Sequence, residues 1–234
     1  MQKLKQGFLK AILFSVSFFI VTSLLFACKS SVPVRETVAP PSINGKLLIL
    51  PFKDMSAIYG ENVSLRCPLC GNVFLTGEVA EGADTVLTNR LISLISDRND
   101  VELIPQDKAH GVRSKLLFGD RGSLSELGLI VETGKALGAD AVLAGYVYRF
   151  RERIGTRYAA DLPASVAFDV HLVDAANGRI MWIGHLDETQ QPLSENLLKL
   201  GAFIKRKGAW ITAEDIASSG LEEILKKFPA ITGH

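Results

Sequence analysis

The sequence predicts an α/β domain: a single mixed sheet with helices packed on it, ending in a β-hairpin and two C-terminal helices. Short apolar runs that end at a proline, such as residues 45–52, alternate with stretches of helical periodicity. Asn177-Gly178 joins two runs of alternating hydrophobicity, which predicts a hairpin. A sheet covered by helices buries the apolar faces of all these elements.

The expected elements follow one another from strand to helix, with local signals at their ends. Ser123 with Glu126 fits a capping box, and Gly138 suits the end of that helix. Thr212 is expected to cap the last helix, which Pro229 ends. The predicted strands are residues 45–52, 101–105, 141–153 and the hairpin 164–190, and the predicted helices are 78–98, 123–140, 193–207 and 212–228.

The first part of the chain is expected to be an export signal rather than part of the fold. Three lysines precede an uncharged stretch that just reaches the length of a transmembrane anchor, the other interpretation. The stretch ends in Leu-Phe-Ala-Cys28, which resembles a bacterial lipoprotein box. The resemblance implies cleavage after residues 1–27 and lipidation of Cys28, and residues 28–44, rich in Ser and Pro, form a tether.

The net charge of the chain and the residue after Cys28 indicate where the protein is located. The leader holds three of the 26 basic residues and none of the 25 acidic ones, so the processed chain has a net charge of about −2. Such a chain has no positive field to draw nucleic acid, and the lipid on Cys28 supplies the contact with the membrane. Lys29, by resemblance to enterobacterial sorting, suggests the outer membrane, facing the periplasm.

Three motifs carry a family resemblance: "LLILPF" at 47–52, "ALGADAVLAGYV" at 136–147 and "VHLVDAANGRIMW" at 170–182. Together they resemble the periplasmic α/β domain of the curli secretion lipoprotein (CsgG), the N-terminal domain of the Tol-system translocation protein (TolB) and lipoprotein activators of peptidoglycan synthases. The resemblance implies a domain at residues 45–190, followed by a helical extension at 191–234. It also implies a non-enzymatic role in envelope assembly, scaffolding or secretion, with an unknown protein partner and self-association.

Two cysteines lie in residues 53–77, an expected irregular insertion, as the motif Cys67-Pro-Leu-Cys70-Gly71. In an oxidising compartment a disulfide is the expected state, and so small a loop stabilises by about 2 kcal/mol. Two alternatives stay open. The pair is a redox pair, or it is half of a metal site whose other ligands come from a histidine or a second copy of the chain.

If the cysteines form a redox pair or half of a metal site, the alternative function is that of a thiol- or zinc-dependent accessory protein that uses Cys67 and Cys70. Neither a G-x-S-x-G nucleophile elbow nor an H-E-x-x-H metal motif is present in the sequence. We therefore assign no catalytic residue, no metal ligand and no cofactor, and we expect that the protein is not an enzyme.

Alternating residues mark two faces of the predicted sheet. Arg149, Arg151 and Arg153 share one face, which is either a docking stripe for a partner or a solvated surface. Trp182 is expected to join the core if Gly178 is left-handed in the hairpin loop. The strand residues expected on that core face are Val166, Phe168, Val170 and Leu172.

Overall fold

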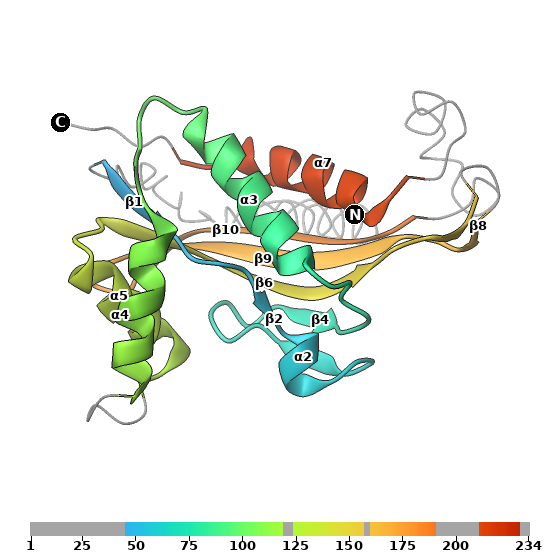
Figure 1. Cartoon of the computed structure of the whole chain (residues 1–234), viewed down its shortest axis with the longest axis horizontal. Coiled ribbons are helices and arrows are strands. Elements are labelled where there is room, and N and C mark those ends of the chain that lie inside the picture. The colour runs from blue at the N-terminus through green and yellow to red at the C-terminus, as the bar shows by residue number, and fades with distance from the viewer. Residues whose placement is uncertain (1–44, 119–123, 157–159, 191–210, 230–234) are drawn as a thin grey trace, which may run out of the picture. The chain divides into compact units, whose positions relative to one another are not determined.

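The computed structural model describes residues 45–118, 124–156, 160–190 and 211–229 (Figure 1). All of them belong to one of the two units into which the chain divides, Pro40–His234. The leader, Cys28, the tether and the predicted helix at 193–207 lie outside the described residues. Within the described ranges, no helix combines the length and apolar character needed to cross a membrane.

The core of the described chain is a six-stranded mixed sheet in the order β10-β9-β6-β1-β5, with β2 also paired to β6. The first strand, β1, runs parallel to both of its neighbours, while β9 pairs antiparallel with β6 and with β10. This arrangement confirms the predicted mixed α/β class. The strands are β1 (Lys46–Ile49), β2 (Lys53–Asp54), β5 (Glu102–Ile104), β6 (Ala141–Arg151), β9 (Ser165–Asp174) and β10 (Ile180–Thr189).

Helices α3 (Ala83–Ser96) and α7 (Ala213–Leu225) cover one face of this sheet (Figure 1). Their apolar residues, such as Leu87, Leu91 and Leu221, pack on Phe168 and its neighbours in the largest buried cluster. Helix α7 begins at the expected cap, Thr212, whose hydroxyl accepts a hydrogen bond from the N–H of Asp215, and the two residues form a capping box. This confirms the predicted N-terminus of the last helix.

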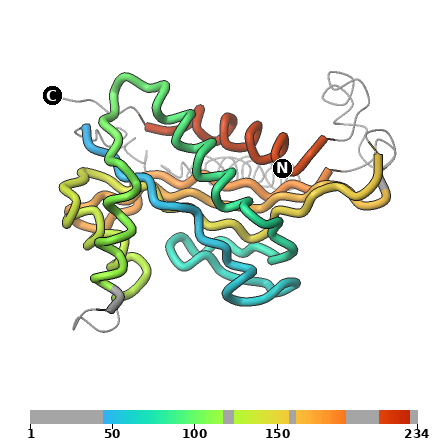
Figure 2. The backbone as a smooth tube through the Cα atoms, viewed as in Figure 1, coloured from blue at the N-terminus to red at the C-terminus, as the bar shows by residue number. Residues whose placement is uncertain are grey.

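A pair of helices and the cysteine-containing insertion cover the opposite face of the sheet, as the backbone trace also shows (Figure 2). Helices α4 (Gln106–Phe118) and α5 (Glu126–Ala136) cover one end, where Ile130 packs against Val142 and Val173. The insertion that contains the two cysteines covers the other end, where Met55, Cys67 and Phe74 pack against Tyr146 and Tyr148.

The hairpin between β9 and β10 has the predicted geometry. Gly178 has a φ of 75°, in the left-handed region, and a bulge between Ile180 and Trp182 follows. Trp182 lies opposite Leu172 in the ladder and joins the main apolar cluster. Its ring meets the Phe228 ring edge-on, with the two ring centroids 5.1 Å apart. The alternating core face expected for this hairpin is therefore confirmed.

Four local features differ from the predictions. The cap of α5 is Ser125, whose hydroxyl accepts a hydrogen bond from Gly128 N–H, and not Ser123. Helix α4 was not predicted. The insertion is not irregular, and two short strands that follow β6 pair antiparallel with each other. These additional elements are α2 (Ser56–Tyr59), β3 (Ser64–Arg66), β4 (Val73–Leu75), β7 (Ile154–Gly155) and β8 (Ala160–Leu162).

Candidate metal centre

The insertion is held on the sheet by its own packing. Strands β3 and β4 form a hairpin, and the Phe74 ring stacks on Tyr148 with centroids 4.2 Å apart and an interplanar angle of 12°. The Ser56 hydroxyl donates to the carbonyls of Gly77 and Tyr148. These contacts hold the insertion on β6, and the turn between its two strands, which begins at Cys67, reaches the neighbouring strand β9.

The turn has the backbone of a metal-binding knuckle. The N–H groups of Leu69 and Cys70 point at the Cys67 sulfur, at 3.4 Å and 3.5 Å. The Gly71 N–H donates to the Cys67 carbonyl at 3.0 Å, and the φ of Gly71 is 77°, a conformation that favours glycine. Backbone donors aimed at one sulfur stabilise a thiolate, which is the form of cysteine that binds metals.

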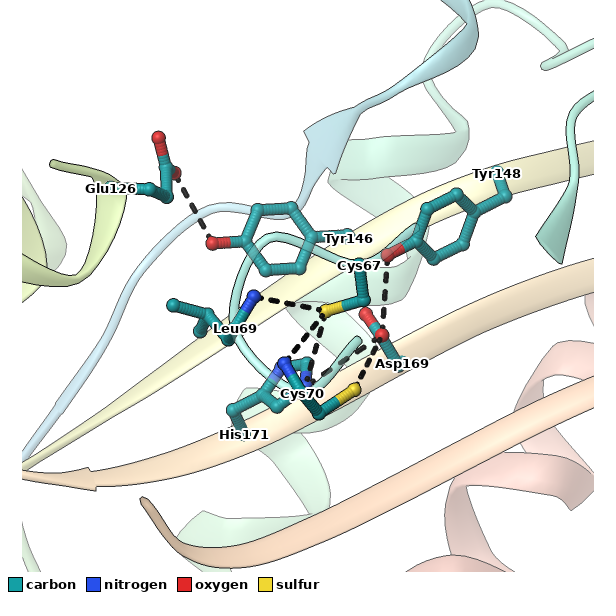
Figure 3. Close-up of polar contacts among 8 residues, drawn as sticks. All are labelled: Cys67, Leu69, Cys70, Glu126, Tyr146, Tyr148, Asp169 and His171. Atoms are coloured by element: carbon teal, nitrogen blue, oxygen red, sulfur yellow. Dashed lines mark hydrogen bonds and ion pairs between the residues drawn. The ribbon is translucent and has the colours of Figure 1, made fainter. Parts of the chain in front are cut away.

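The other half of the site comes from β9. Side chains alternate along a strand, so Phe168 and Val170 enter the main core while Asp169 and His171 point to the insertion (Figure 3). Both polar side chains are fully buried, at 0% exposure. A carboxylate and an imidazole inside an otherwise apolar strand need partners, and here the partners include the two cysteines.

The four side chains converge on one point. The Cys67 Sγ lies 3.5 Å from His171 Nε2, His171 Nε2 lies 3.7 Å from Asp169 Oδ2, and Cys70 Sγ lies 3.8 Å from the same oxygen. All four donor atoms lie within 4.8 Å of one another. Ligands of a tetrahedral zinc ion are about 3.4 to 3.8 Å apart, given the usual zinc–ligand bond lengths. The cluster therefore has the size of a single four-coordinate site.

Both cysteines are free thiols in this structure, and the disulfide expected from the sequence stays a prediction. Cys67 is 3% exposed and Cys70 is half-buried, so the pair differs in access to solvent. The sulfur atoms face Asp169 and His171 in the cluster (Figure 3). The structure thus brings a carboxylate and an imidazole to the cysteine pair, as the metal half-site alternative requires.

Burial sets the protonation of the cluster. Burial raises the pKa of Asp169 to about 7, partly opposed by hydrogen bonds from Cys67, Tyr148 and Cys70. Burial, and then the charge of Asp169, raises the pKa of Cys67 to about 12. Burial lowers the pKa of His171 to about 4, so its imidazole is neutral at neutral pH, as a metal ligand must be.

The surroundings orient these groups without neutralising them. The Tyr148 hydroxyl donates to Asp169 Oδ2 at 3.2 Å, and the Tyr146 ring lies edge-on to the His171 ring at 5.8 Å. Asp169 Oδ1 and His171 Nδ1 have no partner with full hydrogen-bond geometry. In the described part of the chain, no lysine or arginine pairs with Asp169. A cation bound among the four donors would compensate this buried carboxylate.

The donor set decides which ion fits. Two thiolates and an imidazole favour Zn²⁺ over Mg²⁺ or Ca²⁺, which take oxygen ligands. Four protein ligands fill a tetrahedral shell and leave no open position for substrate or water, which is typical of a structural site. Asp169 and His171 were missed from the sequence, although two polar residues at alternate positions of an apolar strand were a usable signal.

The three arginines of the predicted stripe lie in different environments. Arg149 donates to Ser165 Oγ at 2.6 Å, to the Leu75 carbonyl at 2.8 Å and to Asp187, with 11% of its side chain exposed. Arg151 and Arg153 are half-buried and donate to backbone carbonyls at 3.4 Å and 3.2 Å. Arg149 therefore joins the insertion to the sheet, and docking at this stripe remains a prediction.

No protein-family model matches this chain, and no curated protein matches it. Among solved structures, a PelC dodecamer from Paraburkholderia phytofirmans is 14% identical, covering 80% of this chain and 90% of that one, with a TM-score of 0.42. The LpoB C-terminal domain from Salmonella enterica is 17% identical over 64% and 86%, with a TM-score of 0.38. Lipoprotein GNA1162 from Neisseria meningitidis is 13% identical over 69% and 96%, with a TM-score of 0.40. We draw no function from similarity at this level, and the resemblance to CsgG and TolB remains a prediction.

Proposed function

We propose that this chain is a lipid-anchored, non-enzymatic accessory protein of the cell envelope whose domain is fastened by a zinc ion. The ligands are Cys67, Cys70, Asp169 and His171. The observation that carries the zinc site is the convergence of their four donor atoms within 4.8 Å. The envelope location rests on the Leu-Phe-Ala-Cys28 sequence after a charged leader, with the outer membrane favoured by Lys29.

The proposed role of the zinc follows from where its ligands come from. Cys67 and Cys70 belong to the insertion, and Asp169 and His171 belong to β9, an inner strand of the main sheet. The insertion packs on the sheet through a small apolar cluster that it shares with residues of β6 and β9. A metal ion that bridges the two segments cross-links them and contributes its binding free energy to the stability of the fold.

The residues around the ligands have matching roles. With zinc bound, the N–H groups of Leu69 and Cys70 would donate to the Cys67 thiolate, as they do to its sulfur here, and the Tyr148 hydroxyl donates to the carboxylate of Asp169. Such outer contacts orient metal ligands and tune affinity. The chain then presents a rigid surface to an envelope partner, and the partner itself is not identified by these residues.

Metal analysis of the full lipidated chain, extracted from its own membrane without chelator, tests this function. We expect about one zinc per chain. With free zinc about 1,000-fold above the dissociation constant, the bound ion should stabilise the fold by about 4 kcal/mol, a gain that a chelator removes. The double variant Cys67→Ser/Cys70→Ser should contain no zinc.

A matched control separates loss of a ligand from loss of a nearby side chain. His185 lies opposite Asp169 in the β9–β10 ladder, but its side chain is exposed and outside the cluster. His185→Ala should therefore keep its zinc. A wild-type chain that takes up no zinc under reducing conditions, or a Cys67→Ser/Cys70→Ser variant that keeps it, would overturn the zinc proposal.

A further inference from the structure

We infer that Cys70 is a thiol–disulfide exchange site, at which a disulfide oxidant converts the cysteine pair to a disulfide and releases the zinc. This inference rests on the zinc centre proposed above and adds its regulation. The chain is expected in an oxidising compartment, where disulfides are the available class of oxidant. The disulfide expected from the sequence is then the second state of the same site.

The two sulfurs differ in a way that sets the order of reaction. Cys67 is 3% exposed, and its sulfur lies against His171 and under two backbone N–H groups. Cys70 is half-buried at the edge of the apolar cluster of the insertion, and its one described side-chain hydrogen bond is the long one to Asp169. Attack on an external disulfide requires access, so the first bond forms at Cys70.

The pair is also close enough for the second step. The donor atoms of the cluster lie within 4.8 Å of one another, and both cysteines sit in a single turn that ends at left-handed Gly71. A disulfide requires the sulfurs to approach to about 2.05 Å, which rotation of the more exposed Cys70 side chain can supply. Asp169 and His171 are fixed in the inner strand β9 and do not need to move.

The exchange is balanced in atoms and electrons. The Cys70 sulfur attacks one sulfur of the oxidant, the S–S bond of the oxidant breaks, and one half leaves as a thiolate. The Cys67 sulfur then attacks Cys70 in this mixed disulfide, and the second half leaves as a thiolate. Two electrons pass from the two cysteines to the oxidant, and Zn²⁺ departs because two of its four ligands have become a neutral disulfide.

Loss of the ion has a local structural consequence. The insertion then remains on the sheet through contacts such as the Phe74–Tyr148 stack, the Ser56 hydrogen bonds and Arg149. The hairpin β3–β4 becomes easier to open, while the β6–β9–β10 core is unaffected. Oxidation therefore changes the mobility of the insertion without unfolding the domain.

The experiment treats the zinc-loaded full chain with oxidised glutathione in the presence of a chromophoric zinc indicator. We expect one zinc released for each pair of thiols lost, and a Cys67–Cys70 disulfide in peptide mass spectra. In samples quenched early with limiting oxidant, the first glutathione adduct should lie on Cys70, on the order of tenfold above any adduct on Cys67. Hydrogen exchange in residues 64–75 should rise after oxidation, and that of β9 should not.

A second variant keeps the order of steps testable if the mixed disulfide is too brief to detect. In Cys67→Ser the resolving sulfur is absent, so the glutathione adduct at Cys70 should persist. A first adduct at Cys67, or zinc that stays bound under excess oxidant, would refute the exchange site. A chain that never held zinc fails at the loading step, which is failure of the proposed function and is seen before any oxidant is added.

Discussion

The Nε2 atom of His171 lies 3.5 Å from the Sγ atom of Cys67, although the residues are 104 positions apart in the chain. One is in the inner strand β9 and the other is in the turn of an insertion near the start of the domain. The contact exists because β6 and β9 are neighbours in the sheet and the insertion folds over both. The four donors at this junction give the domain a centre that couples its two parts.

Tyr148→Phe should weaken zinc binding and leave the fold intact. The substitution removes the hydroxyl that donates to Asp169 Oδ2 at 3.2 Å and keeps the ring that stacks on Phe74. Loss of an outer contact of this kind typically lowers metal affinity by about 10- to 100-fold. Competition with a zinc chelator measures the change. Tyr59→Phe, at an exposed tyrosine of α2, is the control, and equal affinities in the two variants would contradict the assigned role.

Asp169→Asn should have opposite effects with and without zinc. In the metal-free chain the pKa of Asp169 is raised from 3.8 to about 7, so the folded state holds a proton that the unfolded state has lost. That contribution to stability is fully present below about pH 4 and is lost as the pH rises through about 7. The neutral amide has no such loss. With zinc present, the variant lacks one ligand and should be the less stable protein.

Paired denaturation curves from pH 4 to 8 measure this difference. The pKa of His171 is lowered in the folded state, so His171 changes the stability with pH in the opposite direction. Subtracting the free energy of unfolding of the wild type from that of Asp169→Asn removes this contribution, because both proteins contain His171. In the presence of chelator, the free energy of unfolding of Asp169→Asn should increase relative to that of the wild type as the pH rises. A difference that is constant over this range would show that Asp169 is not the buried titrating group.

Trp182→Ala should destabilise the domain by about 3 kcal/mol, at the lower end for aromatic truncation, because the residue is only half-buried. The indole packs on the main cluster and meets the edge of Phe228. Denaturant unfolding measures the change. Ile183→Ala, at an exposed position of the same strand, should cost less than 1 kcal/mol. Similar losses at both sites would contradict the assignment of the two faces.

Arg149→Ala should lower stability by about 1 to 3 kcal/mol, because it leaves Ser165, the Leu75 carbonyl and Asp187 without their donor. A free docking side chain would give no such loss. Arg153→Ala is the comparison, since its one described contact is to the nearby Gly155 carbonyl. Unchanged stability in Arg149→Ala would restore the docking interpretation of this residue.

Local signals in the sequence predicted much of the fold. Alternation identified β9 and its core face, and Asn177-Gly178 identified the hairpin, because these depend on neighbouring residues only. The spacing Ser-x-x-Glu pointed to Ser123, but the helix begins at Glu126 and the nearer Ser125 reaches the Gly128 N–H. Helix α4 was not predicted because its sequence has little apolar periodicity. Among its described side chains, Ala109 is the buried one.

Only the cysteine half of the candidate site could be predicted from the sequence. The spacing of Cys67 and Cys70 defined a two-ligand turn, but its partners depend on which strand the insertion covers, and that is set by the order of strands in the sheet. Arg149 shows the same limit. Alternation gave it a face that was either a docking stripe or a solvated surface, whereas the bulge between Val147 and Arg149 and the cover provided by the insertion leave only 11% of its side chain exposed.

Zinc K-edge X-ray absorption of the full chain, extracted in its native lipidated form, identifies the ligands of the proposed zinc ion. We expect two sulfur ligands at about 2.3 Å and two nitrogen or oxygen ligands at about 2.0 to 2.2 Å. In His171→Ala the nitrogen or oxygen shell should shrink or the zinc should be lost. A zinc shell made only of oxygen and nitrogen, or no zinc bound at all, would rule out the four-ligand zinc centre.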